Sequence, residues 1–259
     1  MSIRISIITI SYNNEADIRA TLESVINQTL SNYEYIVVDG ASTDKTLEII
    51  QEYNTKINKI ISEPDKGLYD AINKGMKNSS GDIIGLIHAG DRLYNNQVLE
   101  KIALHFESNK IDAMYGHSVM VNKNDKPIRV NKSPKYNKSY IRRGWMPSHQ
   151  SIYIRRKILD RYGYYNLNLH PSSDYEFFLR YFYFKSLKIK RLDSFIILFS
   201  LGGRSTRNYI NNLKAQSQHK ECWRVNGDDP PPLLVPFKLI RKIRQFYLGV
   251  YYRVYRNGY

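Results

Sequence analysis

The stretch Arg4–Ser11 (RISIITIS) is typical of a buried strand in a parallel sheet, because isoleucine recurs along it with only small polar residues between. A helical pattern follows, beginning at Asn14 or Glu15 and ending at Thr29, with its apolar residues on one face. The next apolar run, residues 33–39 (YEYIVVD), predicts a second strand. A strand, a helix and a strand in this order indicate a βαβ unit.

The same alternation continues to about residue 107. The pattern predicts, in chain order, a helix over 43–51 or 43–53, a strand over 57–62, a helix over 69–77, a strand over 82–87 and a helix over 94–107. Strands that alternate with helices at this spacing form right-handed crossovers. We therefore expect an α/β fold with a mostly parallel central sheet flanked by helices.

After about residue 112 the regular alternation of strands and helices ends. We expect a strand over 113–121, a basic hairpin and mobile loop over 122–138, a strand over 150–154, helices over 155–161, 173–185 and 208–225, and two short strands within 187–200. The proline-rich segment 226–236 (NGDDPPPLLVP) is the best candidate for a linker.

The 259 residues carry a formal net charge of +15 and one cysteine, Cys222. One cysteine excludes an internal disulfide and a cysteine-based zinc site, which fits a reducing cytosol. The N-terminal apolar run is too short for a signal peptide, and no stretch has the roughly eighteen uncharged apolar residues of a spanning helix. We expect a soluble or peripheral protein. Its basic charge favours nucleic acid, anionic membrane or phosphorylated substrates as partners, unless it only reflects a composition rich in Lys and Asn.

Four consecutive predicted strands end in carboxylate or amide side chains. The segments are Ser11–Asn14, Asp39–Asp44, Glu63–Gly67 and His88–Asp91. Ligands bind outside the carboxyl ends of parallel strands. The preference of these residues for turns could explain any one segment, but it explains all four together less well. No GxGxxG or GxxxxGK[ST] motif is present, which excludes a glycine-loop phosphate cradle. Carboxylates in this place favour a phosphate ligand held through a divalent cation.

Three motifs in register resemble glycosyltransferase family 2, the GT-A-fold enzymes that use nucleotide sugars. They are residues 6–13 (SIITISYN), 36–46 (IVVDGASTDKT) and 65–75 (DKGLYDAINKG). The resemblance covers roughly residues 3–205 and is greatest to small bacterial enzymes of O-antigen, capsule and exopolysaccharide synthesis. The later segments 147–150 (PSHQ), 174–177 (DYEF) and 202–205 (GGRS) fit that subgroup. The resemblance implies a GT-A domain over 1–225, with a nucleotide-sugar half over 1–112 and an acceptor half over 113–225.

The resemblance also implies donor-binding residues. Asp39 would accept a hydrogen bond from the base, typically uracil, in a nucleoside pocket lined by Thr9, Ser11 and Asn13. The residues placed near the ribose, diphosphate or donor sugar are Asp65, Lys66, Asp70 and His88. Arg204 and Arg207 would clamp the diphosphate from a loop after two glycines, or belong to a solvated basic loop.

Asp91 would match the last carboxylate of the family's DXD motif and hold a divalent metal, Mn²⁺ or Mg²⁺, on the donor diphosphate. The first Asp of that motif is absent from His88–Asp91 (HAGD). Asp174 matches the position of the catalytic base, with helix capping as the alternative reading. Glu176 is the second candidate for the base.

The acceptor side is expected to include Trp145, His149 and Gln150. His149 would contact acceptor or phosphate or complete the metal shell, and the alternative is a structural histidine in a turn. Trp145 would stack on a sugar ring or an apolar acceptor, or pack in the core or at its rim.

Together these features predict inverting transfer of a hexose or N-acetylhexosamine from a nucleotide sugar, foremost a UDP-sugar. The expected acceptor is an undecaprenyl-diphosphate-linked saccharide in bacterial surface polysaccharide synthesis. One alternative is a sugar nucleotidyltransferase, which would normally carry a Gly-rich loop after its first strand. The other is a non-catalytic basic protein that binds membrane or nucleic acid. No recognisable nucleic-acid-binding motif is present, so we expect no nucleic-acid partner.

Residues 237–259 (FKLIRKIRQFYLGVYYRVYRNGY) have the pattern of a basic amphipathic helix. One stripe carries Lys and Arg, the opposite stripe carries Ile, Val and Tyr, and no residue is acidic. Such a helix is typical of membrane interfaces. We expect it to dock a cytoplasmic enzyme on the inner face of the bacterial inner membrane. The alternative is a helix packed on the main domain with its basic face in solvent.

Overall fold

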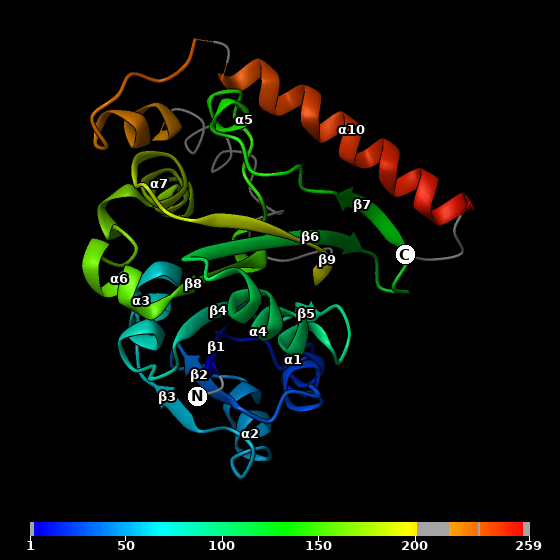
Figure 1. Ribbon diagram of the computed structural model, residues 1–259. Helices are drawn as coiled ribbons and strands as arrows, with labels where there is room; N and C mark the ends of the chain where they lie inside the picture. The colour runs from blue at the N-terminus through cyan, green and yellow to red at the C-terminus, as the bar shows by residue number, and fades with distance from the viewer. Residues whose placement is uncertain (1–2, 201–217, 233, 256–259) are drawn as a thin grey trace.

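The strands join into one mixed sheet in the order β3-β2-β1-β4-β8-β6-β9-β5, with β7 beside β6 (Figure 1). This computed structural model describes residues 3–200, 218–232 and 234–255. The strands are β1 (Ile5–Ser11), β2 (Tyr33–Asp39), β3 (Lys59–Ser62), β4 (Ile83–His88), β5 (Arg92–Leu93), β6 (Ala113–Val121), β7 (Pro127–Asn131), β8 (Ile152–Arg155) and β9 (Ile189–Ser200).

The first four strands form the parallel part of the sheet. β1 pairs with β2 on one side and β4 on the other, and β2 pairs with β3, all in parallel. All seven residues of β1 are buried. Ile8 packs in one core cluster and Ile7 in another, because successive side chains point to opposite faces. The parallel sheet predicted from the N-terminal alternation is confirmed.

The second half of the chain makes the sheet mixed. β8 is antiparallel to both β4 and β6, whereas β9 runs parallel to β6. The prediction of two short strands within 187–200 is wrong, because β9 is one continuous strand. Its register against β6 shifts on either side of His117. Such irregularities break the alternation of apolar and polar residues, so the strand looks interrupted in sequence.

Helices cover both faces of the sheet. They are α1 (Ile18–Ile26), α2 (Thr46–Gln51), α3 (Leu68–Lys77), α4 (Val98–Asn109), α5 (Lys138–Arg142), α6 (Arg156–Tyr162) and α7 (Ser173–Leu179), which continues as a π-helical turn over Arg180–Phe184. α1, α2 and α4 pack in the cluster of Ile7, and α3, α6 and α7 in that of Ile8. Two short 3₁₀ turns, η1 (His149–Ser151) and η2 (Leu167–Leu169), precede β8 and α7.

Some helices begin later than the sequence predicts. α1 begins at Ile18 because residues 14–17 form a turn after Asn13, whose φ is 46°. α4 begins at Val98 because Arg92 and Leu93 pair with β9 as β5. Residues 218–224 are helical, and the rest of the helix predicted over 208–225 lies outside the described residues.

The C-terminal helix α10 (Leu234–Tyr255) lies along β7, at the upper right of Figure 1. It begins before the predicted start at 237. The segment predicted as a linker is tied to the domain, because Asp228 pairs with Arg142 at 3.0 Å and Leu234 is buried in the core. Within the described ranges, no helix combines the length and the apolar character needed to cross a bilayer.

Candidate active site

The carboxyl end of β2 carries Asp39, whose side chain is fully buried. Its oxygens accept hydrogen bonds from the backbone N–H of Ser42 (2.9 Å), from the Ser42 hydroxyl and from the Ser62 hydroxyl (2.9 Å). An ionised carboxylate offers about four acceptor positions. Asp39 therefore fixes the loop after β2 and keeps acceptor capacity for a further donor.

The loop after β2 has an unusual backbone. A Cβ atom on Gly40 would collide with the Asp65 carboxylate, so only glycine allows Asp65 to approach the strand end. Ala41 has a φ of 59°, in the left-handed region that costs energy for residues other than glycine. Asn13 accepts a hydrogen bond from the Thr43 N–H at 2.8 Å. Asn13 therefore ties the first two strand-end loops together.

The loop before α3 is organised by its own acidic residues. Asp65 accepts a hydrogen bond from the Gly67 N–H (2.8 Å), and Asp70 accepts one from the Lys66 N–H (3.0 Å). Asp70 also lies 3.7 Å from the amino group of Lys74. These bonds fix the loop, and the side chain of Lys66 is exposed to solvent.

Three buried polar atoms near the carboxyl ends of β1 and β4 have no hydrogen-bond partner. They are Ser11 Oγ, Asn14 Oδ1 and His88 Nδ1. Buried polar groups are nearly always paired, so three exceptions at one rim point to a polar ligand or to water. The sequence predicts donor contacts for Ser11 and His88 but not for Asn14. The position of Asn14 in the polar segment that follows the first strand was the available signal.

Thr9 does not face this rim. Its hydroxyl lies 2.9 Å from the Tyr35 hydroxyl, and both residues are fully buried. The alternation along β1 turns Thr9 toward the side of the sheet that α1 and α4 cover. The predicted nucleoside contact of Thr9 is wrong.

Asp91 lies three residues beyond β4 and is held from two sides. Its Oδ2 accepts a hydrogen bond from Gln150 Nε2 (2.7 Å), and its Oδ1 accepts one from the Ser200 N–H (3.1 Å). The Gln150 Oε1 accepts in turn from the His88 N–H at 2.8 Å. Burial outweighs these bonds and raises the pKa of Asp91 to about 6.

Gln150 is thus a positioning residue. Both ends of its amide are engaged, and the residue is buried. The predicted contact of Gln150 with the acceptor is therefore not observed. The side chain points into the protein, between β4 and Asp91.

His88 and His149 form a pair next to Asp91. Their Nε2 atoms are 2.7 Å apart, so one ring donates and the other accepts, and at least one ring is neutral. Burial lowers the pKa of both imidazoles. The Nδ1 atom of His149 lies 3.9 Å from Asp174 Oδ2. A polar chain therefore runs from Asp174 through the two rings toward Asp91.

Asp174 lies in the first turn of α7, whose N-cap, Ser172, makes no side-chain capping bond. The Asp174 side chain is 30% exposed. Glu176, the second candidate for the base, is buried and pairs with Arg180 at 2.8 Å. That pairing occupies Glu176 and leaves Asp174 as the accessible carboxylate on this helix.

Trp145 is a core residue. It is 1% exposed, and its ring meets the rings of Tyr115 at 5.1 Å and Phe178 at 5.9 Å in edge-on geometry. The predicted stacking on an acceptor is wrong, since aromatic rings cover the indole. Arg204 and Arg207, the predicted diphosphate clamp, lie outside the described residues.

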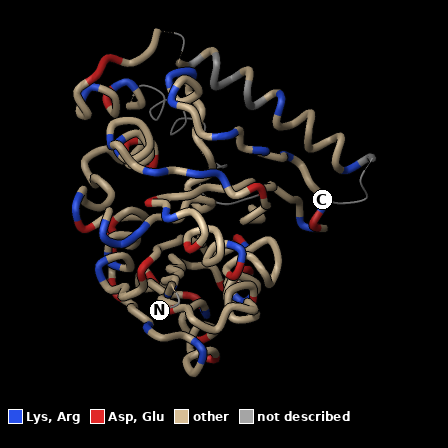
Figure 2. Tube along the Cα trace, viewed as in Figure 1, with Lys and Arg blue, Asp and Glu red and all other residues tan. Residues whose placement is uncertain are grey.

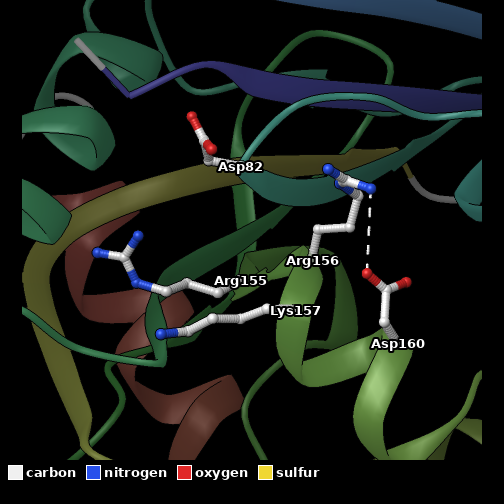
Figure 3. Close-up of a pocket in the computed structure, with 5 residues that line it drawn as sticks. All are labelled: Asp82, Arg155, Arg156, Lys157 and Asp160. Carbon is white, nitrogen blue, oxygen red and sulfur yellow. Dashed lines mark ion pairs between the residues drawn. The ribbon is translucent and has the colours of Figure 1, made fainter. Parts of the chain in front are cut away.

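A pocket of about 160 Å³ lies at the other end of the sheet (Figure 3). It is lined by Asp82, Arg155, Arg156, Lys157 and Asp160. Figure 3 shows Arg156 turned toward Asp160, at 3.9 Å. Because Asp82 directly precedes β4, this pocket lies at the amino end of the strand, away from Asp91.

Residues 6–186, well over half of the chain, match the family model described as glycosyl transferase family 2. The chain belongs to glycosyl transferase family 2.

Curated relatives of this family 2 chain are glycosyltransferases. A PGL/p-HBAD biosynthesis glycosyltransferase of Mycobacterium bovis (strain BCG / Pasteur 1173P2) is 31% identical over 181 residues, which are 68% of this chain and 69% of the relative. An uncharacterised glycosyltransferase of Methanocaldococcus jannaschii is 28% identical over 222 residues, 82% of this chain and 75% of the relative.

Two solved structures share the fold. S. aureus TarS 1–349 in complex with UDP-GlcNAc superposes with a TM-score of 0.69 at 21% identity, over 86% of this chain and 65% of TarS 1–349. The mannosyltransferase PcManGT of Pyrobaculum calidifontis, in complex with GDP-Man and Mn²⁺, has a TM-score of 0.67 at 15% identity. This superposition covers 97% of this chain and 75% of PcManGT. The likeness shows the GT-A architecture. The chain spans just under two thirds of TarS 1–349.

Family 2 enzymes of the GT-A fold commonly use a divalent metal. In the described part of this chain, no cluster of three His, Cys, Asp or Glu side chains can hold one. A metal that is bound to a diphosphate needs fewer protein ligands, because Mg²⁺ takes one or two carboxylates plus phosphate oxygens and water. Asp91 suits that requirement: it is a partly buried carboxylate that makes no ion pair with the described Lys and Arg residues.

Proposed function

We propose that this family 2 protein transfers a hexose or N-acetylhexosamine from a nucleotide sugar to a saccharide hydroxyl, with inversion at the anomeric carbon. The observation that carries the proposal is the convergence of Asp91 and Asp174 on one rim through Gln150, His88 and His149. The Asp91 carboxylate is held on both oxygens by hydrogen bonds, and the Asp174 carboxylate is 30% exposed and accessible to a substrate.

Asp174 is the proposed base. The acceptor hydroxyl must lose its proton as its oxygen attacks the anomeric carbon, and a positioned carboxylate contributes about 10²- to 10⁴-fold to such a step. The attack from the side opposite the leaving nucleoside diphosphate inverts the configuration. The His149 Nδ1 atom lies 3.9 Å from this carboxylate, close enough for an electrostatic contact.

The donor would lie over the ends of β1, β2 and β4. Asp39 is the proposed partner of the base, Ser11, Asn14 and His88 offer their unpaired atoms, and Lys66, Arg204 and Arg207 are the proposed cations for the phosphates. Asp91 would hold Mn²⁺ or Mg²⁺. When bound, the metal would neutralise charge on the leaving diphosphate, acting as a Lewis acid. We favour a UDP-sugar, as in TarS, over the GDP-sugar found in PcManGT.

The proposed acceptor is a saccharide on undecaprenyl diphosphate in O-antigen or capsule synthesis, met at the cytoplasmic face of the bacterial inner membrane. Another lipid-linked acceptor fits the same site, since the Mycobacterium bovis relative is described for PGL/p-HBAD biosynthesis. Family membership favours sugar transfer over the nucleotidyltransferase and over a non-catalytic binding protein.

Nucleoside-diphosphate release from a panel of UDP-, GDP- and dTDP-sugars tests the proposal. The assay uses the full chain with Mn²⁺, Mg²⁺ or EDTA, and compares the wild type with Asp91→Asn. We expect metal-dependent release from one donor and a loss of about 10²- to 10³-fold in the variant, as for removal of one electrostatic stabiliser. Glu107→Gln, at an exposed acidic residue of α4, serves as the control and should retain activity.

Release that persists unchanged in EDTA and in Asp91→Asn would remove the metal from the proposal and leave the transferase. No release and no donor binding, measured by calorimetry across the whole panel, would contradict the transferase itself.

A further inference from the structure

The face of α10 that points away from β7 is apolar. Its exposed side chains, here called the outer stripe, are Ile240, Ile243, Phe246, Tyr247, Val250 and Tyr251. Ile243 and Tyr247 are 70% and 71% exposed. Among the described residues, half of the twelve exposed large hydrophobic side chains lie on this one helix. A contiguous apolar surface of this kind marks a contact with a partner or a membrane.

The opposite face of α10 holds the helix on β7. A Cβ atom on Gly249 would collide with the Ile128 carbonyl, so glycine allows the helix backbone to approach the strand. Arg253 donates from Nε (3.0 Å) and Nη2 (2.8 Å) to the Pro127 carbonyl. Gln245, Gly249 and Arg253 belong to the polar stripe of the predicted amphipathic helix. These three members of the polar stripe therefore contact the domain, and the described side chains of the apolar stripe are left outside.

This orientation is decisive for what the helix can do. A helix that only completed the core would turn its apolar face inward, because burial of apolar surface drives packing. Here Tyr252 alone among the described aromatic residues of α10 is buried, against Val119 and Val130. The alternative expected from the sequence, a helix packed on the main domain with its basic face in solvent, agrees in part: α10 packs on β7, and the described Arg244 and Arg253 are exposed. The apolar stripe is exposed as well.

The part of the chain that carries the outer stripe is rich in Lys and Arg. α10 contains five Lys or Arg residues and no Asp or Glu, and residues 126–143, which include β7 and α5, contain seven and none. Figure 2 shows several stretches in the colour of Lys and Arg, and none in that of Asp and Glu, in this part of the chain beside α10. Arg244 is exposed next to the stripe, and Arg129 lies over the Phe246 ring at 5.9 Å.

We infer that α10 docks the protein on an anionic lipid bilayer, with the outer stripe inserted into the interface and Arg244, exposed beside the stripe, facing lipid head groups. Aliphatic side chains together with Tyr on one helix face, and Lys and Arg beside them, are the features of helices that lie in a membrane surface. Each basic residue near anionic lipid adds to the attraction.

A second copy of the chain suits the stripe less well. The 22 residues of α10 span about 33 Å, and a stripe about 10 Å wide offers about 330 Å². Stable protein interfaces bury about 800 Å² on each partner. A bilayer has no such minimum, because apolar insertion and charge attraction add along the helix.

The docking surface extends the proposed function, since it would bring the site to a lipid-linked acceptor, but it rests on α10 and not on the active-site geometry. Its test is flotation of the full chain with vesicles of phosphatidylglycerol and phosphatidylcholine. Ile243→Gln/Tyr247→Gln removes two members of the outer stripe. Leu104→Gln, at an exposed residue of α4, is the matched control.

We expect the wild type and Leu104→Gln to float with anionic vesicles, and Ile243→Gln/Tyr247→Gln to bind at least about tenfold more weakly, as burial of two large apolar side chains requires. Pure phosphatidylcholine should bind all three less. Equal flotation of the stripe variant and the control, or no flotation of the wild type, overturns the inference. So does a wild-type dimer in analytical ultracentrifugation that the stripe variant loses.

Donor turnover in solution separates the two proposals. The stripe variant should release nucleoside diphosphate at the wild-type rate without vesicles. Flotation without any turnover would leave the docking surface standing and remove the transferase.

Discussion

His88 and His149 meet through their Nε2 atoms at 2.7 Å, although they come from the end of β4 and from a 3₁₀ turn 61 residues later. The contact joins the strand that precedes Asp91 to the segment that faces Asp174. It is therefore the central contact of the polar chain between the two carboxylates on which the proposed chemistry depends.

The His88–His149 contact should appear as energetic coupling. In a double-mutant cycle with His88→Asn and His149→Asn, we expect the free energies of unfolding to be non-additive by about 0.5–3 kcal/mol, the range for residues in contact. Urea denaturation of the four proteins measures it. His105 bonds only with Asn109 of its own helix among the described residues, so His88→Asn with His105→Asn should be additive within about 0.5 kcal/mol. Additivity of the first cycle would show that the pair is not formed in solution.

Asp174 and Glu176 should respond to substitution in opposite ways. Asp174→Asn should lower kcat about 10²- to 10⁴-fold with little change in Tm, because the accessible carboxylate acts on substrate. Glu176→Gln should cost about 1–3 kcal/mol of stability, because the partly buried Arg180 loses its charged partner and keeps only its bonds to backbone carbonyls. Turnover assays and thermal unfolding distinguish them. A fully active Asp174→Asn enzyme would remove this residue as the base.

Trp145 should matter for stability. Trp145→Ala should destabilise the fold by about 3–5 kcal/mol, because it empties a site enclosed by Tyr115 and Phe178. Urea denaturation measures the loss, and Trp145→Phe should recover part of it. If the alanine variant keeps its stability and loses only acceptor affinity, the indole faces the acceptor after all.

His117 should give an acid-side loss of stability. Its Nδ1 accepts a hydrogen bond from the Ser133 N–H (3.2 Å), its Nε2 lies 2.8 Å from Asp193, and burial lowers its pKa despite that neighbour. The unfolded chain, with a His pKa near 6.5, then binds more protons than the native state. The contribution of neutral His117 to the free energy of unfolding is fully present above about pH 6.5 and is lost as the pH falls toward the lower native pKa.

His117→Asn keeps an acceptor for Ser133 and removes the titration. Its unfolding free energy, measured in urea between about pH 5 and 7, should fall less steeply with decreasing pH than that of the wild type. Identical pH profiles would mean that His117 does not carry the effect.

Much of the fold was predictable because it is encoded locally. The apolar runs of β1, β2 and β4, and the helices between them, follow from periodicity over ten or fifteen residues. The polar residues that end those strands meet at one rim for a reason of topology alone, since parallel strands share their carboxyl ends. Asp39, Asp91 and Asp174 could therefore be named in advance, the last through family resemblance.

Contacts between distant segments could not be predicted in the same way. Thr9 is polar and follows a strand pattern, but the face to which it turns depends on the register of β1 with β2. Gln150 lies 59 residues from Asp91 in sequence, and nothing local to either residue shows that one amide holds both the carboxylate and the His88 backbone. The burial of Trp145 likewise depends on rings from β6 and α7.

The sequence alone determined the alternation of strands and helices, the acidic rim and the amphipathic character of residues 237–259, because each is set by the spacing of apolar and polar residues along the chain. Only the tertiary structure decided which of those residues face a ligand, which are held by a partner, and which face of α10 is turned outward. The physical reason is that an amphipathic sequence shows only that two faces of a helix differ. The face that packs is selected by contacts with β7, where the backbone approaches at Gly249 and the Pro127 carbonyl accepts from Arg253.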